Sequence, residues 1–383
     1  MMKCSGLNFA TGELVEIGFD SAISRVEPLL ESAADPPLLA PGFIDLQVNG
    51  YAGADFNLPE TVAEQVSCAV RALRAVGVAR FFPTVITGPF ERMVAALGNL
   101  ARIRETIPEG ASIEAIHLEG PYISPEDGPR GAHPRQWVRP PDLDEFKRFQ
   151  EAAGGLIRLV TVAPEWPSAL RFIEVLTGSG VVVSLGHTRA SAEQIRAAIE
   201  AGASVSTHLG NAAETTVARR SNCLWEQLAD DRLTACFIVD DFHLETSFLK
   251  VALRAKGVER SVLVSDAAAP AGRPPGVYRM GELDVTLGAD GSIKLPDGRL
   301  AGSAINLKQA VENVMRRAAF GLRDAVVMAT VNAARAGRLS GRLRGLAVGE
   351  RADIIQFRFD RQSKSITIEK TFVGGVPCEP QPC

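Results

Sequence analysis

Short apolar runs rich in β-branched residues alternate with longer amphipathic segments between residues 42 and 266. The runs are 42–48, 80–86, 113–119, 157–162, 181–187, 204–209, 234–240 and 261–266. Between them, apolar residues recur at three- and four-residue steps, which is typical of helices; these segments are 63–77, 91–105, 143–153, 168–178, 191–202 and 245–257. Strands alternating with helices predict parallel βαβ units. The pattern therefore predicts the α/β class, as a (β/α)8 TIM-like barrel.

The two ends of the chain carry a different pattern, in which apolar and polar residues alternate as in partly exposed strands. These stretches are 14–19 and 22–26, before a Pro-rich joint at 35–41, and 352–359 and 365–373. We expect both ends to pair in a small β-sandwich domain, residues 1–40 plus 345–383, beside a catalytic barrel of residues 41–344. Two runs, 281–287 and 292–295, are joined by Ala289-Asp-Gly. This signal predicts a β-hairpin insertion near 274–301, beside the barrel rim.

Composition excludes several classes of protein. The 383-residue chain has 41 Lys and Arg against 45 Asp and Glu, so nothing indicates nucleic acid or an anionic membrane as a partner. No apolar run reaches membrane-spanning length, and the N-terminus is too short in apolar residues for a signal peptide. The cysteines show no paired spacing: Cys4, Cys68, Cys223, Cys236, Cys378 and Cys383. We expect reduced thiols and a cytoplasmic location.

Four of the predicted strands end at or just before a side chain that can bind a metal or move a proton. These side chains are Glu119, His187, His208 and Asp266. In a (β/α)8 barrel the C-terminal ends of the strands meet at one rim, so the four are expected to converge. Two imidazoles and a carboxylate are a common ligand set for catalytic zinc or iron, because they leave a coordination position for water. The alternative is that these histidines are packing residues with satisfied hydrogen bonds, and spacing alone leaves both interpretations open.

Asp266 is the candidate for proton transfer. A carboxylate at the end of the last strand can take a proton from metal-bound water and return it to a leaving group. Asp is also frequent as a helix N-cap, which is the alternative role. Its position directly after the eighth apolar run favours proton transfer.

Seven segments, in this order, resemble the signature segments of the N-acetylglucosamine-6-phosphate deacetylases of the amidohydrolase superfamily. They are 40–50, 117–122, 130–134, 183–188, 207–212, 265–272 and 300–303. The resemblance implies one divalent metal per chain, Zn²⁺ or Fe²⁺, on Glu119, His187 and His208, with Asp266 as the acid and base. It implies that His133 supports the oxyanion and that the substrate contacts Asn211, Ala212, His133 and His243.

The chain departs from this family at several positions. Gln47-Val-Asn49 replaces the His-x-His that carries a second metal in many amidohydrolases, which favours a single-metal site. Gly210 and Ala213 replace a large aromatic residue and a Met, and Phe242 replaces a Gly. The family's Gly-Arg-x-Pro-Gly loop, whose Arg reaches the phosphate in a neighbouring subunit, is also altered. Arg219 or Arg220 is the candidate replacement; a solvated basic pair is the alternative.

The resemblance implies hydrolysis of N-acetylglucosamine-6-phosphate to glucosamine-6-phosphate and acetate, by a homodimer whose partner is a small amino-sugar substrate. The alternatives are a deacetylase of a related N-acyl amino sugar, such as N-acetylgalactosamine-6-phosphate, and another amidohydrolase acting on a small amide, such as a cyclic amide or an N-acyl amino acid. A third alternative is a non-catalytic barrel that serves as a binding or structural protein. Such a barrel has no physical need for Glu119, His187, His208 and Asp266 together at its rim.

Overall fold

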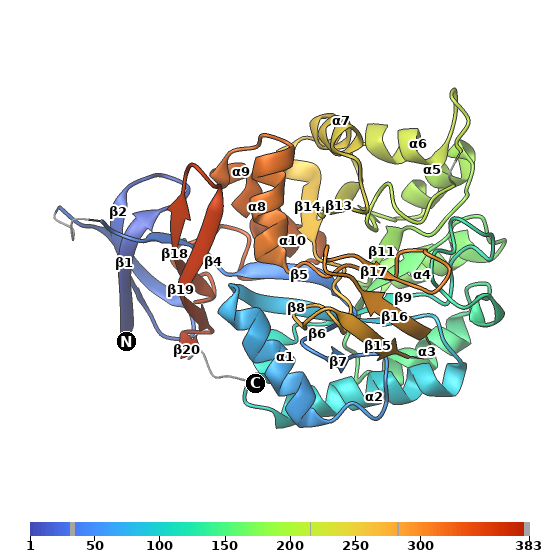
Figure 1. Cartoon of the computed structure of the whole chain (residues 1–383), viewed down its shortest axis with the longest axis horizontal. Coiled ribbons are helices and arrows are strands. Elements are labelled where there is room, and N and C mark those ends of the chain that lie inside the picture. Colours follow the sequence, from blue (N-terminus) through green and yellow to red (C-terminus); the bar gives the residue numbers. More distant parts are fainter. Residues whose placement is uncertain (31–34, 215, 282, 379–383) are drawn as a thin grey trace.

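The barrel is an eight-stranded parallel sheet with the order β14-β13-β12-β11-β10-β9-β8-β5 (Figure 1). The computed structural model describes residues 1–30, 35–214, 216–281 and 283–378. The barrel strands are β5 (Phe43–Val48), β8 (Val78–Ile86), β9 (Ile116–Glu119), β10 (Ile157–Val162), β11 (Val182–Leu185), β12 (Val205–Ser206), β13 (Thr234–Ile238) and β14 (Ser261–Val264). Each overlaps one of the predicted runs, so the predicted fold is confirmed.

The barrel closes where β14 returns to β5. The backbone N–H of Asp266 donates to the carbonyl oxygen of Gln47 at 3.0 Å, and Val48 pairs with Ala267 in a parallel bridge. This closure brings the ends of the first and last strands together. The residues that follow them therefore face the same rim.

Helices surround the barrel in Figure 1. They are α1 (Ala63–Ala75), α2 (Phe90–Thr106), α3 (Leu143–Ala152), α4 (Ala169–Gly178), α5 (Ala192–Glu200), α6 (Cys223–Ala229), α7 (Thr246–Lys256), α8 (Leu307–Arg317), α9 (Leu322–Met328) and α10 (Val331–Ala336). The six predicted helices are confirmed, and α6 and α8 to α10 come in addition. Ala333 and Ala334 of α10 belong to the apolar cluster inside the barrel, with Leu46 of β5 and Val264 of β14. Because α10 packs into this interior, the barrel is filled by side chains and is no open pore.

Both ends of the chain build one seven-stranded sheet, with the order β20-β19-β18-β4-β1-β2-β3. Its strands are β1 (Met2–Asn8), β2 (Leu14–Phe19), β3 (Ile23–Pro28), β4 (Leu38–Pro41), β18 (Ile354–Asp360), β19 (Ser365–Val373) and β20 (Val376–Cys378). Ile17 and Phe19 share a buried cluster with Ile354 and Phe372, so the two halves of the small domain enclose a common core. The Pro-rich joint contains β4, which pairs with both halves. The boundaries of the two domains stay a prediction.

A three-stranded antiparallel sheet follows the barrel and contains β15 (Gly276–Met280), β16 (Leu283–Leu287) and β17 (Ile293–Lys294). The runs predicted as a hairpin are β16 and β17. A two-stranded ribbon, β6 (Gly50–Tyr51) and β7 (Ala54–Asp55), follows β5. Met280 and Leu283 of the three-stranded sheet line the same cavity as the strand-end residues. This insertion is therefore one wall of the candidate site.

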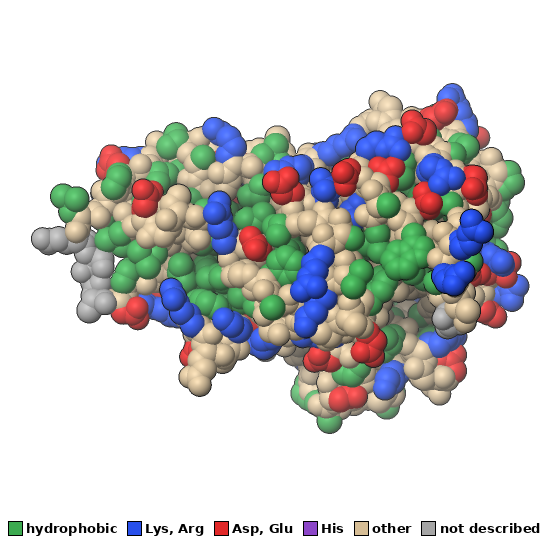
Figure 2. All heavy atoms as spheres, turned by 90° about the horizontal axis from the view of Figure 1, so that it is seen from above, with side chains coloured by type: hydrophobic (Ala, Val, Ile, Leu, Met, Phe, Trp, Pro, Cys, Tyr) green, Lys and Arg blue, Asp and Glu red, His purple; other side chains and the backbone are tan. Residues whose placement is uncertain are grey.

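The surface and the thiols bear on the remaining predictions. Acidic and basic side chains are mixed over the face drawn in Figure 2. Within the described ranges, no helix has the length and apolar content that a bilayer span requires.

Cys4, Cys223, Cys236 and Cys378 are free, but Cys68 is disulfide-bonded. The prediction of reduced thiols is therefore wrong for Cys68, because pairing depends on which sulfurs meet in space and not on sequence spacing.

Candidate active site

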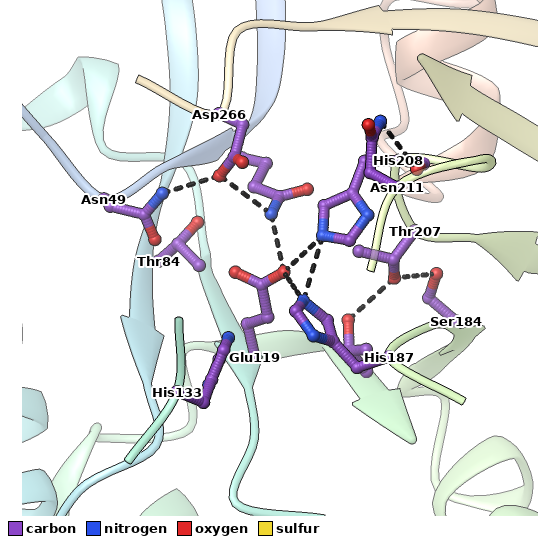
Figure 3. Close-up of polar contacts among 12 residues, drawn as sticks. Asn49, Thr84, Glu119, His133, Ser184, His187, Thr207, His208, Asn211 and Asp266 are labelled. Atoms are coloured by element: carbon purple, nitrogen blue, oxygen red, sulfur yellow. Dashed lines mark hydrogen bonds and ion pairs between the residues drawn. The ribbon is translucent and has the colours of Figure 1, made fainter. Parts of the chain in front are cut away.

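Four buried side chains meet at the C-terminal rim of the barrel (Figure 3). Glu119 ends β9, whereas His187, His208 and Asp266 come two residues after β11, β12 and β14 respectively. Their exposed fractions are between 2% and 8%. The side chains expected to converge therefore do lie together, although the sequence separates the first and last by more than a hundred residues.

Three of these side chains point ligand atoms at one another. Nε2 of His187 and Nε2 of His208 lie 3.2 and 2.9 Å from Oε1 of Glu119 and 3.1 Å from each other. The carbonyl oxygen of Pro129 lies 2.9 Å from Nδ1 of His187 and accepts its proton, which leaves the Nε2 lone pair free for a metal. Nδ1 of His208 has no hydrogen-bond partner among the described residues.

The spacing of these three atoms fits a metal. Zinc binds imidazole nitrogen and carboxylate oxygen at about 2.0 to 2.2 Å in a tetrahedral arrangement, so two ligand atoms are separated by about 3.3 Å. The observed separations, 2.9 to 3.2 Å, are close to that value. Glu119, His187 and His208 therefore need only small movements to hold a divalent ion.

The backbone at this rim is strained. His187, His208 and Asp266 have φ angles of 50°, 27° and 50°, and Ala212 beside them has 45°. Such positive angles are uncommon for residues other than glycine. Strain of this kind concentrates at functional sites, where the surrounding structure holds it in place. Here it coincides with the turns that direct the strand-end side chains into the rim.

The two amides that replace His-x-His are hydrogen-bond donors to the carboxylates. Nε2 of Gln47 donates to Oε1 of Glu119 at 2.8 Å and to Oδ1 of Asp266 at 3.0 Å. Nδ2 of Asn49 donates to the same Asp266 oxygen at 2.6 Å. The amides therefore fix the two carboxylates relative to each other, a role that an imidazole bound to a second metal does not fill.

Burial and neighbouring charge shift the pKa values of these groups. Burial alone would raise the pKa of Glu119, but hydrogen bonds and the charge of His187 and His208 hold it well below its usual range. Burial would lower the pKa of His208, but the bond to Glu119 raises it above the ordinary value. Burial and the nearby Glu119 raise the pKa of Asp266 to about 6. Asp266 can therefore both hold and release a proton near neutral pH.

Two further histidines, His133 and His243, line the same cavity. Nδ1 of His133 lies 2.8 Å from the hydroxyl of Thr87. Burial, followed by the charge of His187, lowers the pKa of His133 to about 3, so this ring is neutral. Nδ1 of His243 lies 2.6 Å from Oδ2 of Asp240. Both rings are thus held by a partner inside the protein.

The loop after β12 brings Asn211 and Ala212 to the cavity. A Cβ atom on Gly210 would lie 2.5 Å from the ring of Phe248, so Phe248 occupies the space that a larger side chain at position 210 would need. Arg219 and Arg220 are exposed and do not line this cavity. The single chain therefore leaves their predicted contact with the phosphate untested.

Some cavity residues were not found from the sequence. They are Asn57, Ile86, Met280, Leu283 and Arg299. The hairpin signal predicted an insertion beside the rim. It could not predict which side chains of the insertion face the cavity, because that depends on how the three-stranded sheet packs against the barrel. Thr87, the partner of His133, carries no motif of its own.

Comparison with known proteins agrees with this geometry. Residues 38–378 match the model of the amidohydrolase family. The chain is 32% identical to the N-acetylglucosamine-6-phosphate deacetylase of Bacillus subtilis over 329 residues, which are 85% of this chain and 82% of the relative. It is 31% identical to the N-acetylgalactosamine-6-phosphate deacetylase of Escherichia coli O157:H7, with 88% of each chain covered.

Solved structures are similar over nearly the whole chain. A mutant of N-acetyl-D-glucosamine-6-phosphate deacetylase from Mycobacterium smegmatis, in complex with N-acetyl-D-glucosamine-6-phosphate, has a TM-score of 0.85 and 32% identity, with 95% of this chain and 94% of that chain covered. The deacetylase from Thermotoga maritima has a TM-score of 0.87 and 26% identity, with coverage of 99% and 100%. The chain therefore belongs to the amidohydrolase family and, within it, to the family of N-acetylglucosamine-6-phosphate deacetylases.

Proposed function

We propose that this protein is a metal-dependent hydrolase that removes the N-acetyl group of N-acetylglucosamine-6-phosphate, giving glucosamine-6-phosphate and acetate. One observation carries the proposal: a Glu/His/His cluster and a hydrogen-bonded aspartate share one cavity. Amide hydrolysis needs both an electrophilic centre and a proton carrier beside it. Relatives with this activity, at 32% identity over most of the chain, support the same substrate class.

Glu119, His187 and His208 would hold one divalent ion, and their nitrogen and oxygen donors suit Zn²⁺ or Fe²⁺. When bound, the ion supplies a Lewis acid for the amide carbonyl and lowers the pKa of water toward neutrality. A second set, Glu119, His133 and His187, also has ligand atoms within 4.8 Å of one another. We favour His208 over His133 because its Nε2 is 2.9 and 3.1 Å from the other two ligand atoms.

Asp266 would accept a proton from the attacking water and deliver it to the departing amine. The bonds from Gln47 and Asn49 hold its Oδ1 atom, which leaves Oδ2 for the proton. His133 is neutral and meets Thr87 through Nδ1. With the Thr87 hydroxyl as donor, Nε2–H remains to stabilise the oxyanion that forms on the carbonyl oxygen.

The sugar phosphate would contact Asn211, Ala212 and His243, which line the same cavity. N-acetylgalactosamine-6-phosphate is the second candidate substrate, because a relative with that activity matches over 88% of both chains. A cytoplasmic homodimer, in which Arg219 or Arg220 reaches the neighbouring subunit, completes the proposal.

The test is acetate release from metal-loaded protein with N-acetylglucosamine-6-phosphate, its galactosamine epimer and unphosphorylated N-acetylglucosamine. We expect the highest kcat/KM with the first and loss of activity on chelation. Preference for the epimer would change the sugar and keep the reaction. The absence of acetate from all three substrates, with metal bound, would reject the deacetylase function.

A further inference from the structure

The substrate contacts proposed above within one chain, Asn211, Ala212 and His243, include no lysine or arginine for the phosphate. A phosphate monoester carries a charge of about −1.5 to −2 at neutral pH. The cavity already holds the carboxylates of Glu119 and Asp266. Among its lining residues in the described part of the chain, Arg299 is the one arginine or lysine side chain.

Arg299 is held in a defined position on the insertion, after β17. Its Nη1 donates to the carbonyl oxygen of Gly131 at 2.7 Å. Its Nε and Nη2 contact Oδ2 of Asp297 at 2.9 and 2.7 Å. A guanidinium group has five N–H donors, so one on Nη1 and one on Nη2 remain for a ligand. Two N–H donors of one guanidinium match the spacing of phosphate oxygens.

Gly131 connects this arginine to the reaction centre. A Cβ atom on Gly131 would lie 3.4 Å from Cε1 of His187 and 3.8 Å from Cβ of Ala212. Gly131 thus packs against a proposed metal ligand and a proposed substrate contact, while its carbonyl oxygen binds Arg299. In a hexosamine 6-phosphate, the amide and the phosphate lie on opposite sides of one pyranose ring. Gly131 therefore lies between Arg299 and the proposed metal ligand His187.

Asp297 does not cancel this role. Arg299 and Asp297 are 48% and 53% exposed, and water weakens an ion pair between such exposed side chains. Arg219 and Arg220 are also exposed, but they do not line the cavity of their own chain.

We propose that Arg299 is a specificity-determining residue that binds the 6-phosphate of the substrate within the same chain. This inference rests on the proposed function, because it assumes a phosphorylated amino sugar in this cavity. The prediction for Arg219 and Arg220 places the phosphate-binding arginine on a loop of the neighbouring subunit. The present proposal places it on the insertion of the same chain, so no second subunit is needed.

The experiment compares Arg299→Ala, Arg299→Lys and wild type with N-acetylglucosamine-6-phosphate and with N-acetylglucosamine. Losing a charge-assisted contact should raise KM for the phosphorylated substrate by about tenfold to a hundredfold. We expect kcat to change much less, and KM for the unphosphorylated sugar to stay constant. Arg299→Lys should be intermediate, because it keeps the charge and loses the paired donors. Arg279→Ala is the matched control, since Arg279 pairs with Asp284 on the same sheet and does not line the cavity.

Binding of glucosamine 6-phosphate, measured by calorimetry on metal-loaded protein, separates this inference from the proposed function. Weaker binding by Arg299→Ala supports the inference even if wild type releases no acetate, a result that would reject only the function. Normal turnover by wild type, with KM and binding unchanged in Arg299→Ala, overturns the inference and keeps the function. An equal rise in KM for both sugars also overturns it, because it would indicate a structural role.

Discussion

Arg80 and Asp353 form a buried two-bond ion pair between the barrel and the small domain. Nε and Nη2 of Arg80 on β8 donate to the two carboxylate oxygens of Asp353 at 2.8 and 2.9 Å, and the side chains are 1% and 3% exposed. Arg342 adds a bond of 2.8 Å to the same carboxylate. Asp353 is the residue before β18, so its carboxylate connects the C-terminal part of the small domain to the barrel.

Asp353→Asn should destabilise the protein by about 3 kcal/mol, because it removes the carboxylate that makes two direct bonds with the buried Arg80 and leaves the more distant Glu114 carboxylate, at 3.7 Å, as counter-charge. Urea unfolding measures the change. Glu369→Gln is the control, since Glu369 pairs with Arg358 at the surface, where an ion pair contributes about 0 to 1 kcal/mol. The acetate-release rate of folded protein should not change in either variant. Equal stabilities of the two variants would contradict the role given to the buried pair.

The stability contributed by Asp353 should depend on pH in a defined direction. Burial would raise its pKa, but the hydrogen bond and charge of Arg80 lower it to about 2, against about 3.9 for an unfolded chain. A carboxyl with a lowered folded pKa contributes stability above the unfolded value and loses it as the pH falls. The difference in unfolding free energy between wild type and Asp353→Asn should be constant from about pH 5 to 7 and shrink below about pH 4. A difference that grows on acidification would refute the assignment.

The sequence predicts the barrel well because each strand and helix has its own periodicity, and Glu119, His187, His208 and Asp266 sit at the ends of strands. Strand β4 was missed, because the surrounding prolines obscure a segment of four residues, Leu38–Pro41. The hydrogen bonds from Gln47 to Glu119 and Asp266 join residues far apart in sequence. No local pattern encodes such contacts, and the same holds for the position of Arg299 against Gly131.

His187→Ala and His208→Ala should each lose the bound metal, because removing one imidazole leaves two protein ligands of the three proposed. Elemental analysis of purified protein should give about one divalent ion per chain for wild type and much less for both variants. His117→Ala is the control. His117 is a buried histidine beside the site, but its ring is hydrogen-bonded to Thr161 and it is not a proposed metal ligand, so its removal should leave the metal bound. Full metal content in both ligand variants would show that the wrong residues were assigned.

Asp266→Asn should keep the metal and lose turnover. The amide has the same shape, but it cannot carry a proton, so kcat should fall by a factor of about 10² to 10⁴. Metal analysis and acetate release are measured on the same sample, because the role proposed for Asp266 separates the two. If turnover stayed near that of wild type, Asp266 would have only a capping role; if metal were lost as well, it would be a ligand.

Arg219 and Arg220 lie on the exposed loop before α6, where a second subunit could approach. If one of them reaches the phosphate in a neighbouring subunit, the double variant Arg219→Ala/Arg220→Ala should lose about one to two decades in kcat/KM with the phosphorylated sugar alone. Mixing this variant with a His208→Ala chain should then restore some activity, because each mixed dimer would contain one complete site, whereas the homodimers would contain none. The oligomeric state is measured in parallel. Unchanged rates in the double variant would reject this loop as the phosphate contact, and Arg299 would then be the remaining arginine candidate.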